Sequence, residues 1–169
     1  KMGFEPTPTP LQRIYPGVLA LIGGGTLIIV YITEYAFNLE PCRLCLIQRI
    51  PYVIIAVIGW IGLKHSDWLS AGNLTAIAGF VFLAGATIAV YHVGIEQHLW
   101  QSAVGCSGEL SQQISANQLQ DMLQQKPPKS CNEIDWTLFG VSMASYNAFF
   151  SLICAGITFK IARRLWETS

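Results

Sequence analysis

Five cysteines are the residues of this sequence whose types and spacing indicate chemistry most directly. Cys42 and Cys45 form a Cys-x-x-Cys pair. Cys106 and Cys131 lie further apart, and Cys154 stands alone. A disulfide that closes so short a loop as Cys-x-x-Cys stabilises a fold little, because the gain grows with loop length. The first pair therefore predicts redox-active thiol chemistry rather than a structural disulfide.

A predicted helix start and a cation surround this pair. Pro41 suits the first turn of a helix, where its missing N–H costs nothing, and a helix start lowers a cysteine pKa. Arg49 follows Cys45 by four residues, so the two side chains share a helix face. We expect Arg49 to stabilise the Cys45 thiolate or an electron-rich oxygen on a bound acceptor. The alternative is a side chain that extends outward to lipid phosphates. Pro51 predicts a kink just beyond.

The composition places these residues in a membrane protein. Charged residues make up 12% of the 169 positions and hydrophobic residues 52%, and the mean hydropathy is +0.44. Soluble domains carry about 25% charged residues. Ten basic residues balance ten acidic ones, so the basic surface that nucleic-acid binding requires is lacking. The sequence predicts a lipid bilayer as partner and no nucleic acid.

Four apolar runs predict a single all-α domain, residues 1–169, built as a bundle of four transmembrane helices. A span needs about 20 residues to cross the hydrocarbon core. The expected spans are residues 14–33, 44–63, 71–94 and 137–160. They leave two larger external loops, residues 34–43 and 95–136. In the second loop, a capping-box pattern and an apolar stripe predict a short amphipathic helix over 116–125, lying in the membrane interface or on the rim of the bundle.

The charges beside the spans predict the orientation. The side that holds both termini carries six basic and three acidic residues, and the side of the two larger loops carries four basic and seven acidic ones. Basic residues concentrate in cytoplasmic segments. Both termini should therefore be cytoplasmic and both larger loops external. This topology places four of the five cysteines on the external side.

Two cysteine pairs on one side predict an electron relay. Small and polar neighbours of Cys106 and Cys131 predict a disulfide approachable from outside, and such a disulfide is labile. Electrons from an external dithiol would enter there, pass to Cys42 and Cys45 by thiol exchange, and leave to a membrane-soluble acceptor, for which a quinone is the obvious candidate. Cys154, in the last apolar run, is expected to be a buried packing residue.

Several segments together resemble the bacterial disulfide bond formation protein B (DsbB) family. They are residues 40–51 (EPCRLCLIQRIP), 91–96 (YHVGIE), 105–107 (GCS), 130–133 (SCNE) and 136–144 (WTLFGVSMA). The resemblance implies a four-helix protein of the bacterial inner membrane with periplasmic loops. It also implies an enzyme that reoxidises a periplasmic thioredoxin-fold oxidant, DsbA, and reduces ubiquinone or menaquinone.

The resemblance also implies a role for each cysteine of the two pairs. By motif position, Cys106 forms the mixed disulfide with the DsbA-like partner, and Cys131 is its pair. Cys45 meets the quinone ring, and Cys42 is its exchange partner.

Two further residues are implied on the quinone side of the site. Arg49 supplies the charge beside the quinone. A second residue near the outer end of the third span is His92, with His98 as the alternative; either histidine alone is also explained by packing or by an interfacial position.

Three other interpretations remain open from the sequence. The four external cysteines could be structural or bind zinc tetrahedrally. A vitamin K epoxide reductase-like enzyme also couples loop cysteines to a quinone, although its Cys-x-x-Cys comes late in the chain. A specialised relative of the DsbB family would serve a dedicated partner.

Overall fold

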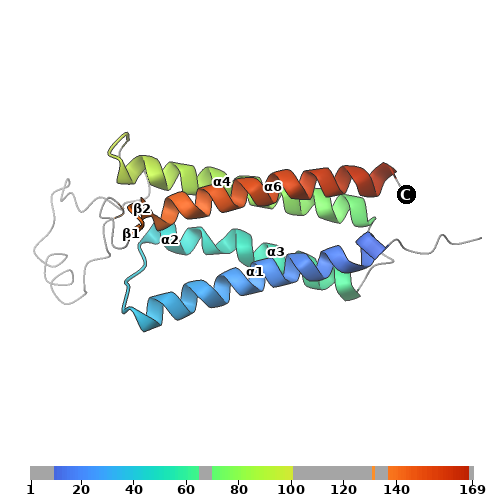
Figure 1. The fold of residues 1–169 in the computed structure, drawn as a ribbon, viewed down its shortest axis with the longest axis horizontal. Helices are drawn as coiled ribbons and strands as arrows, with labels where there is room; N and C mark the ends of the chain where they lie inside the picture. Colours follow the sequence, from blue (N-terminus) through green and yellow to red (C-terminus); the bar gives the residue numbers. More distant parts are fainter. Residues whose placement is uncertain (1–9, 65–69, 101–130, 132–136, 168–169) are drawn as a thin grey trace, which may run out of the picture.

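The computed structural model describes residues 10–64, 70–100, 131 and 137–167. Long helices run alongside one another over most of this part of the chain (Figure 1). They are α1 (Pro10–Ala36), the short α2 (Arg43–Ile47) with α3 (Arg49–Lys64), α4 (Ala71–Glu96) and α6 (Met143–Glu167). The predicted all-α, four-helix architecture is confirmed. By length and composition, α1, α2 with α3, and α4 are candidate membrane spans, and α6 completes the bundle.

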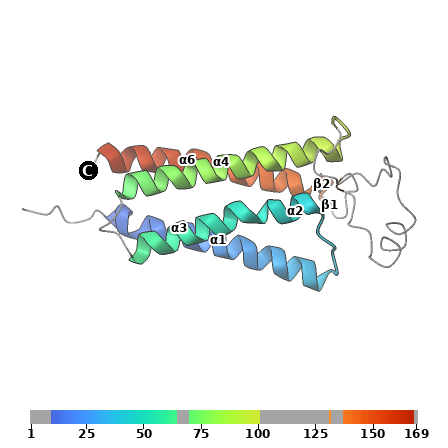
Figure 2. The same cartoon turned by 180° about the vertical axis from the view of Figure 1, so that it is seen from behind.

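The bundle consists of two tightly packed helix pairs. α1 packs against α3 and α4 packs against α6, while α3 and α4 join the pairs (Figure 2). Glycine permits the close approach of α1 and α3. A Cβ atom on Gly23 would lie 2.6 Å from the Tyr52 carbonyl oxygen, and one on Gly59 would overlap the backbone of Ala20. Small residues at helix contacts are typical of membrane bundles, where close packing replaces the hydrophobic effect.

Large apolar side chains cover the outside of the bundle. Leu21, Phe80 and Phe149 are each more than 60% exposed, although they belong to long helices. In water such a surface would cost free energy, whereas in lipid it is the favourable one. Some polar groups of the helices pair inside the bundle, as Tyr15 and Thr158 do in their 2.8 Å hydrogen bond.

The second predicted span is interrupted at Gln48, which separates α2 from α3. The Gln48 N–H still bonds to the Leu44 carbonyl at 2.9 Å. The next turn cannot continue in the same way, because Pro51 has no N–H to offer the Ile47 carbonyl. The predicted effect of Pro51 on this helix therefore takes the form of a short interruption at Gln48, which is buried in the bundle.

The last span was expected to begin at residue 137, but α6 begins at Met143. Residues 137–142 form a hairpin of β1 (Thr137–Leu138) and β2 (Val141–Ser142). Phe139 and Gly140 both have positive φ, as a tight two-residue hairpin turn requires. An uncharged run does not distinguish a hairpin from a helix, which is why the boundary was placed too early. The Ser142 hydroxyl then accepts from the Ser145 N–H and begins α6.

Most of the second loop lies outside the described residues. The predicted amphipathic helix over 116–125 and Cys106 belong to that part of the chain.

Candidate active site

Cys42 and Cys45 lie at the start of α2, at the end of the bundle that also carries the hairpin (Figure 1). Their sulfur atoms are 3.0 Å apart, and both thiols are free. Cys42 is the N-cap of α2, because its sulfur accepts the Cys45 N–H at 3.3 Å. Pro41 therefore precedes the helix rather than forming its first turn. The predicted position of the pair at a helix start is confirmed.

The surroundings of Cys42 favour its thiolate. The hydrogen bond with Cys45 lowers the pKa of the Cys42 thiol most strongly, and the side chain of His92 and the backbone N–H of Cys45 lower it further. Burial acts in the opposite direction but is outweighed, so the pKa falls from 9.0 to about 4. A thiol with so low a pKa is ionised at neutral pH, as in redox-active cysteine pairs.

His92 comes to the pair from α4. It is 4% exposed, and its Nε2 atom lies 3.7 Å from the Cys42 sulfur. The same nitrogen lies 3.8 Å from the Glu96 carboxylate one turn later on α4. His98, the sequence alternative, lies beyond the end of α4 on the exposed surface. The structure therefore places His92, not His98, at the cysteine pair.

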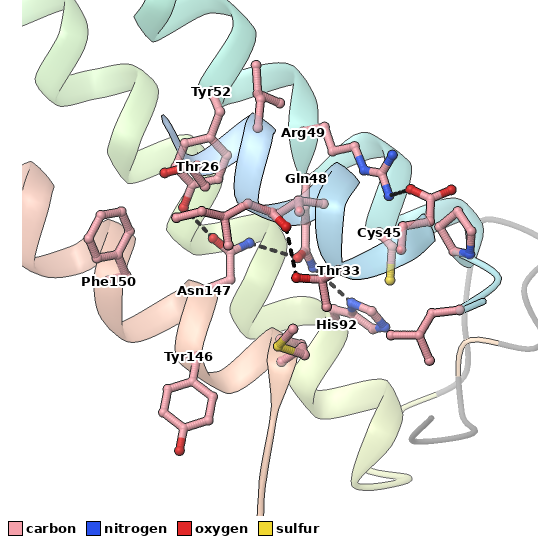
Figure 3. Close-up of a pocket in the computed structure, with 18 of the residues that line it drawn as sticks. Thr26, Thr33, Cys45, Gln48, Arg49, Tyr52, His92, Tyr146, Asn147 and Phe150 are labelled. Atoms are coloured by element: carbon pink, nitrogen blue, oxygen red, sulfur yellow. Dashed lines mark hydrogen bonds and ion pairs between the residues drawn. The ribbon is translucent and has the colours of Figure 1, made fainter. Parts of the chain in front are cut away.

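A chain of side-chain hydrogen bonds leads from His92 across three helices (Figure 3). Gln48 Nε2 lies 2.8 Å from His92 Nδ1, and Asn147 Nδ2 of α6 donates to Gln48 Oε1 at 2.7 Å. The Tyr52 hydroxyl donates to Asn147 Oδ1 and also contacts Ser151 at 3.0 Å. A buried polar network of this kind is stable only when each member has a partner. It fixes the orientation of the imidazole ring beside Cys42.

Arg49 points to α1 rather than to Cys45. Its Nη2 atom lies 2.6 Å from the Glu34 carboxylate, and the guanidinium lies 4.7 Å from the centre of the Tyr31 ring. Its side chain is 12% exposed, so it does not extend into the lipid headgroups. Its Nε–H is buried and has no hydrogen-bond partner within the described part of the chain. The guanidinium thus retains a free donor for a ligand, which favours the predicted oxygen partner over the Cys45 thiolate.

Cys131 lies against the first pair. It is disulfide-bonded, and it packs in one apolar cluster with Cys42, Leu44 and Ile95. It is only 1% exposed, so the predicted approach from outside is wrong for this sulfur. Small and polar neighbours did not reveal that the chain folds back over α2. Burial in this cluster places Cys131 next to Cys42.

A cavity of about 570 Å³ adjoins these groups. Cys45, His92, Arg49 and Gln48 lie together at one end of its lining (Figure 3), and Cys42 also lines it. The rest of its wall is mainly apolar and comes from α1 and α6, through residues Leu27, Ile29, Val30, Phe149, Phe150 and Ile153. Ligand sites of small molecules have this size and this combination of apolar walls with a few polar groups.

Sequence reasoning missed three residues of this site: Gln48, Asn147 and Glu34. Each lies within or at the end of an apolar run, where a polar side chain must find a partner. That signal was present for Gln48 and Asn147. It does not say which helix supplies the partner, so the network itself required the structure.

The fold and the site define a helical membrane protein with a Cys-x-x-Cys pair of free thiols at one end of its bundle. Residues 12–161 match the family model described as disulfide bond formation protein DsbB. The chain belongs to the DsbB family of disulfide bond formation proteins.

The curated relatives agree with this membership. The chain is 27% identical to disulfide bond formation protein B of Acinetobacter baylyi, over 90% of this chain and 92% of the relative. The corresponding protein of Acinetobacter baumannii is 28% identical over 83% of this chain and 85% of the relative. An uncharacterized protein of Rickettsia prowazekii is 28% identical over 72% of this chain and 71% of the relative. No solved structure matches the chain.

Membership of this family distinguishes between two of the functions considered from the sequence. It favours disulfide bond formation over the vitamin K epoxide reductase-like alternative.

Proposed function

We propose that this protein is a quinone-dependent thiol oxidase of the bacterial inner membrane. It takes electrons from the dithiol of a periplasmic, DsbA-like thioredoxin-fold protein and delivers them to ubiquinone or menaquinone. The observation that carries the proposal is a single cavity lined by Cys42, Cys45 and Arg49. A dithiol and a buried cation thereby face the same small-molecule site.

The residues of the cavity fit a quinone. The apolar walls between α1 and α6 suit an isoprenoid chain, because they lie on the lipid-facing part of the bundle. The buried Nε–H of Arg49 lacks a partner among the described residues, and a carbonyl oxygen would satisfy it. A bound quinone supplies an acceptor for two electrons and two protons. Arg49 would hold its oxygen, and Glu34 and Tyr31 would hold Arg49 in place.

The thiol steps require two exchanges. A thiolate of the partner attacks Cys106 of the second disulfide, which forms a mixed disulfide and releases Cys131. The partner's other thiol displaces Cys106, so the partner leaves oxidised and the second pair becomes a dithiol. A Cys131 thiolate then attacks Cys42, and Cys106 attacks Cys131 to restore the second disulfide. The first pair is left as the dithiol, holding both electrons.

The position of Cys131 supports exchange at Cys42. Both residues are buried in one cluster, whereas Cys45 is only partly buried at its edge. Exchange at Cys42 releases Cys45 toward the acceptor. The low pKa of Cys42 stabilises the reduced pair, which makes its disulfide a stronger oxidant toward an incoming thiol.

The membrane orientation follows from charge. The side that holds both termini carries six of the ten basic residues against three acidic ones, so we place it in the cytoplasm. The cysteine end then faces the periplasm, where a soluble partner reaches it. The partner proteins that support activity in the assay below would show whether the enzyme serves a general oxidant or one dedicated partner.

The test is anaerobic quinone reduction by the purified protein in detergent, supplied with a reduced thioredoxin-fold dithiol. Catalytic quinone consumption is expected, and Cys45→Ser and Cys106→Ser should each abolish it. Cys154→Ala is the matched control, because this thiol lies in α6, away from the cavity lining. Folded protein that reduces none of several quinones with several partners would overturn the proposal.

A further inference from the structure

The reduced pair and His92 form a compact cluster of metal-ligand atoms. The two sulfurs and a ring nitrogen of His92 all lie within 4.8 Å of one another, and the cluster is largely buried. Two thiolates with one imidazole are a donor set that Zn²⁺ prefers. We propose that the reduced Cys42–Cys45 pair and His92 bind a thiophilic divalent cation such as Zn²⁺, and that this cation blocks oxidation of the pair. The binding site stands on its own geometry, whereas the block rests on the proposed function.

The distances fit tetrahedral coordination with little movement. With Zn–S near 2.3 Å and Zn–N near 2.0 Å, the ligand atoms lie about 3.8 Å apart for two sulfurs and about 3.5 Å apart for sulfur and nitrogen. Cys42 Sγ and His92 Nε2 are 3.7 Å apart, close to that value. The two sulfurs, at 3.0 Å, have to separate slightly. Rotation of the less buried Cys45 side chain provides this movement.

The fourth coordination position would be left to water, and Glu96 lies beside the cluster without belonging to it. Its Oε1 atom lies 3.8 Å from His92 Nε2, and its side chain is 7% exposed. The Ser142 hydroxyl donates to the other carboxylate oxygen at 2.5 Å and holds the group in place. Arg49 does not neutralise this end of the cavity, because it is already paired with Glu34. A divalent cation would therefore compensate two thiolates and a carboxylate in a site of low dielectric.

Gln48 provides the outer support that a metal-bound histidine needs. A histidine that ligates through Nε2 donates its Nδ1–H to a carbonyl or carboxylate oxygen. Rotation of the Gln48 amide presents Oε1 to His92 Nδ1, and the Asn147 amide rotates with it. This series of hydrogen bonds ends at the hydroxyls of Tyr52 and Ser151, which can each donate or accept. Each polar group of the network therefore keeps a hydrogen-bond partner whether His92 Nδ1 accepts or donates.

Cation binding and disulfide formation exclude each other. Both sulfurs bind M²⁺ as thiolates and keep both electrons, so they remain reduced. A disulfide has no thiolate to offer and does not bind the ion. The cation therefore binds the protein only when the Cys42–Cys45 pair is reduced, and it competes with transfer of the electrons to the acceptor. The site would make turnover sensitive to free zinc in the external compartment.

The experiment uses Co²⁺ as a spectroscopic probe of the full-length protein. In the Cys106→Ser/Cys131→Ser variant, reduced and anaerobic, one equivalent of Co²⁺ should give thiolate-to-metal charge-transfer absorption and tetrahedral d–d bands. Zn²⁺ should displace it, and the oxidised variant should give no bands. Absence of these bands in the reduced variant would overturn the site. Bands that appear only in protein that retains Cys106 and Cys131 would overturn it as well.

Matched substitutions in the same variant test the third ligand and its support. His92→Ala should weaken Co²⁺ binding by more than tenfold, whereas His98→Ala, at an exposed histidine, should not change it. Gln48→Leu should weaken binding about 10- to 100-fold, and Gln48→Glu should restore it, because its carboxylate accepts the Nδ1–H. Unchanged affinity in His92→Ala would reduce the site to a simple dithiol and contradict the proposal.

Activity separates this inference from the proposed function. Quinone reduction by the wild-type protein should fall on addition of Zn²⁺ and recover on chelation. Protein that reduces quinone but is insensitive to Zn²⁺ would contradict the block alone. Protein that binds Co²⁺ through Cys42, Cys45 and His92 but reduces no quinone would contradict the proposed function alone.

Discussion

His92 of α4 and Gln48, at the break between α2 and α3, meet through a 2.8 Å contact between imidazole Nδ1 and amide Nε2. Both side chains are buried, Gln48 with 8% and His92 with 4% exposed. Gln48 is held in turn by Asn147 of α6. The two helix pairs of the bundle are thus joined by hydrogen bonds directly beside the cysteines. The orientation of His92 toward Cys42 depends on this junction.

The first prediction concerns the ionisation of Cys42. In reduced protein whose other external thiols are replaced, with Cys45 retained, thiolate absorbance should persist as the pH falls and disappear only near pH 4. The sign follows from the hydrogen bond with Cys45, which favours the charged form, and from the nearby His92. His92→Ala should move the transition to higher pH. A transition near the ordinary thiol pKa of about 8.5 would contradict the assignment.

Arg49 should act on the quinone step. Arg49→Ala removes a charged hydrogen-bond donor worth about 1.5–3 kcal/mol. The kcat/KM for quinone should therefore fall about ten- to hundredfold. Thiol exchange with the partner, measured as formation of the mixed disulfide, should be nearly unchanged. Arg43→Ala, at a neighbouring exposed arginine, is the control; equal loss of both steps in Arg49→Ala would remove Arg49 from the quinone side.

Asn147 should contribute to stability through the network. Asn147→Leu leaves Gln48 Oε1 and the Tyr52 hydroxyl without their amide partner, and an unsatisfied buried group costs about 1–3 kcal/mol. Reversible unfolding in mixed detergent should show a loss of that size. Asn73→Leu is the matched control, because Asn73 bonds to Trp166 at an exposed position and should lose less. A larger loss at Asn73 would contradict the role of the network.

Gly59 should be intolerant of even one methyl group. A Cβ there would overlap the Ala20 backbone, so Gly59→Ala must push α1 away from α3. Overpacking of this kind costs about 1–3 kcal/mol. Thermal unfolding in detergent measures the effect. Gly24→Ala adds the same methyl group where nothing lies within 4 Å, and it should retain wild-type stability.

Cys154 should not take part in turnover. It is buried in α6 within the apolar core, and Cys154→Ala removes only a small packing group. Quinone reduction by this variant should match that of the wild-type protein. An inactive but folded Cys154→Ala protein would assign the fifth cysteine a role that its position does not suggest.

The sequence alone determined the long helices that the described residues form and the end of the bundle at which Cys42 and Cys45 lie. Long apolar runs are a local property, and each run must form a helix in lipid because its backbone polar groups have no other partner. The Cys-x-x-Cys motif with Pro41 likewise predicted that the cysteine pair lies at a helix start. The fourth helix boundary was missed, because the uncharged residues 137–142 are compatible with helix and hairpin alike.

Only the tertiary structure decided which side chains meet at the site. The pairs His92 with Gln48, Asn147 with Gln48, and Arg49 with Glu34 come from different segments of the chain. Such contacts depend on the rotation of each helix about its axis. Helices that are largely apolar on every side, as in lipid, carry little periodicity to reveal that rotation. Close packing at small residues fixes it, and with it the environment of the cysteines.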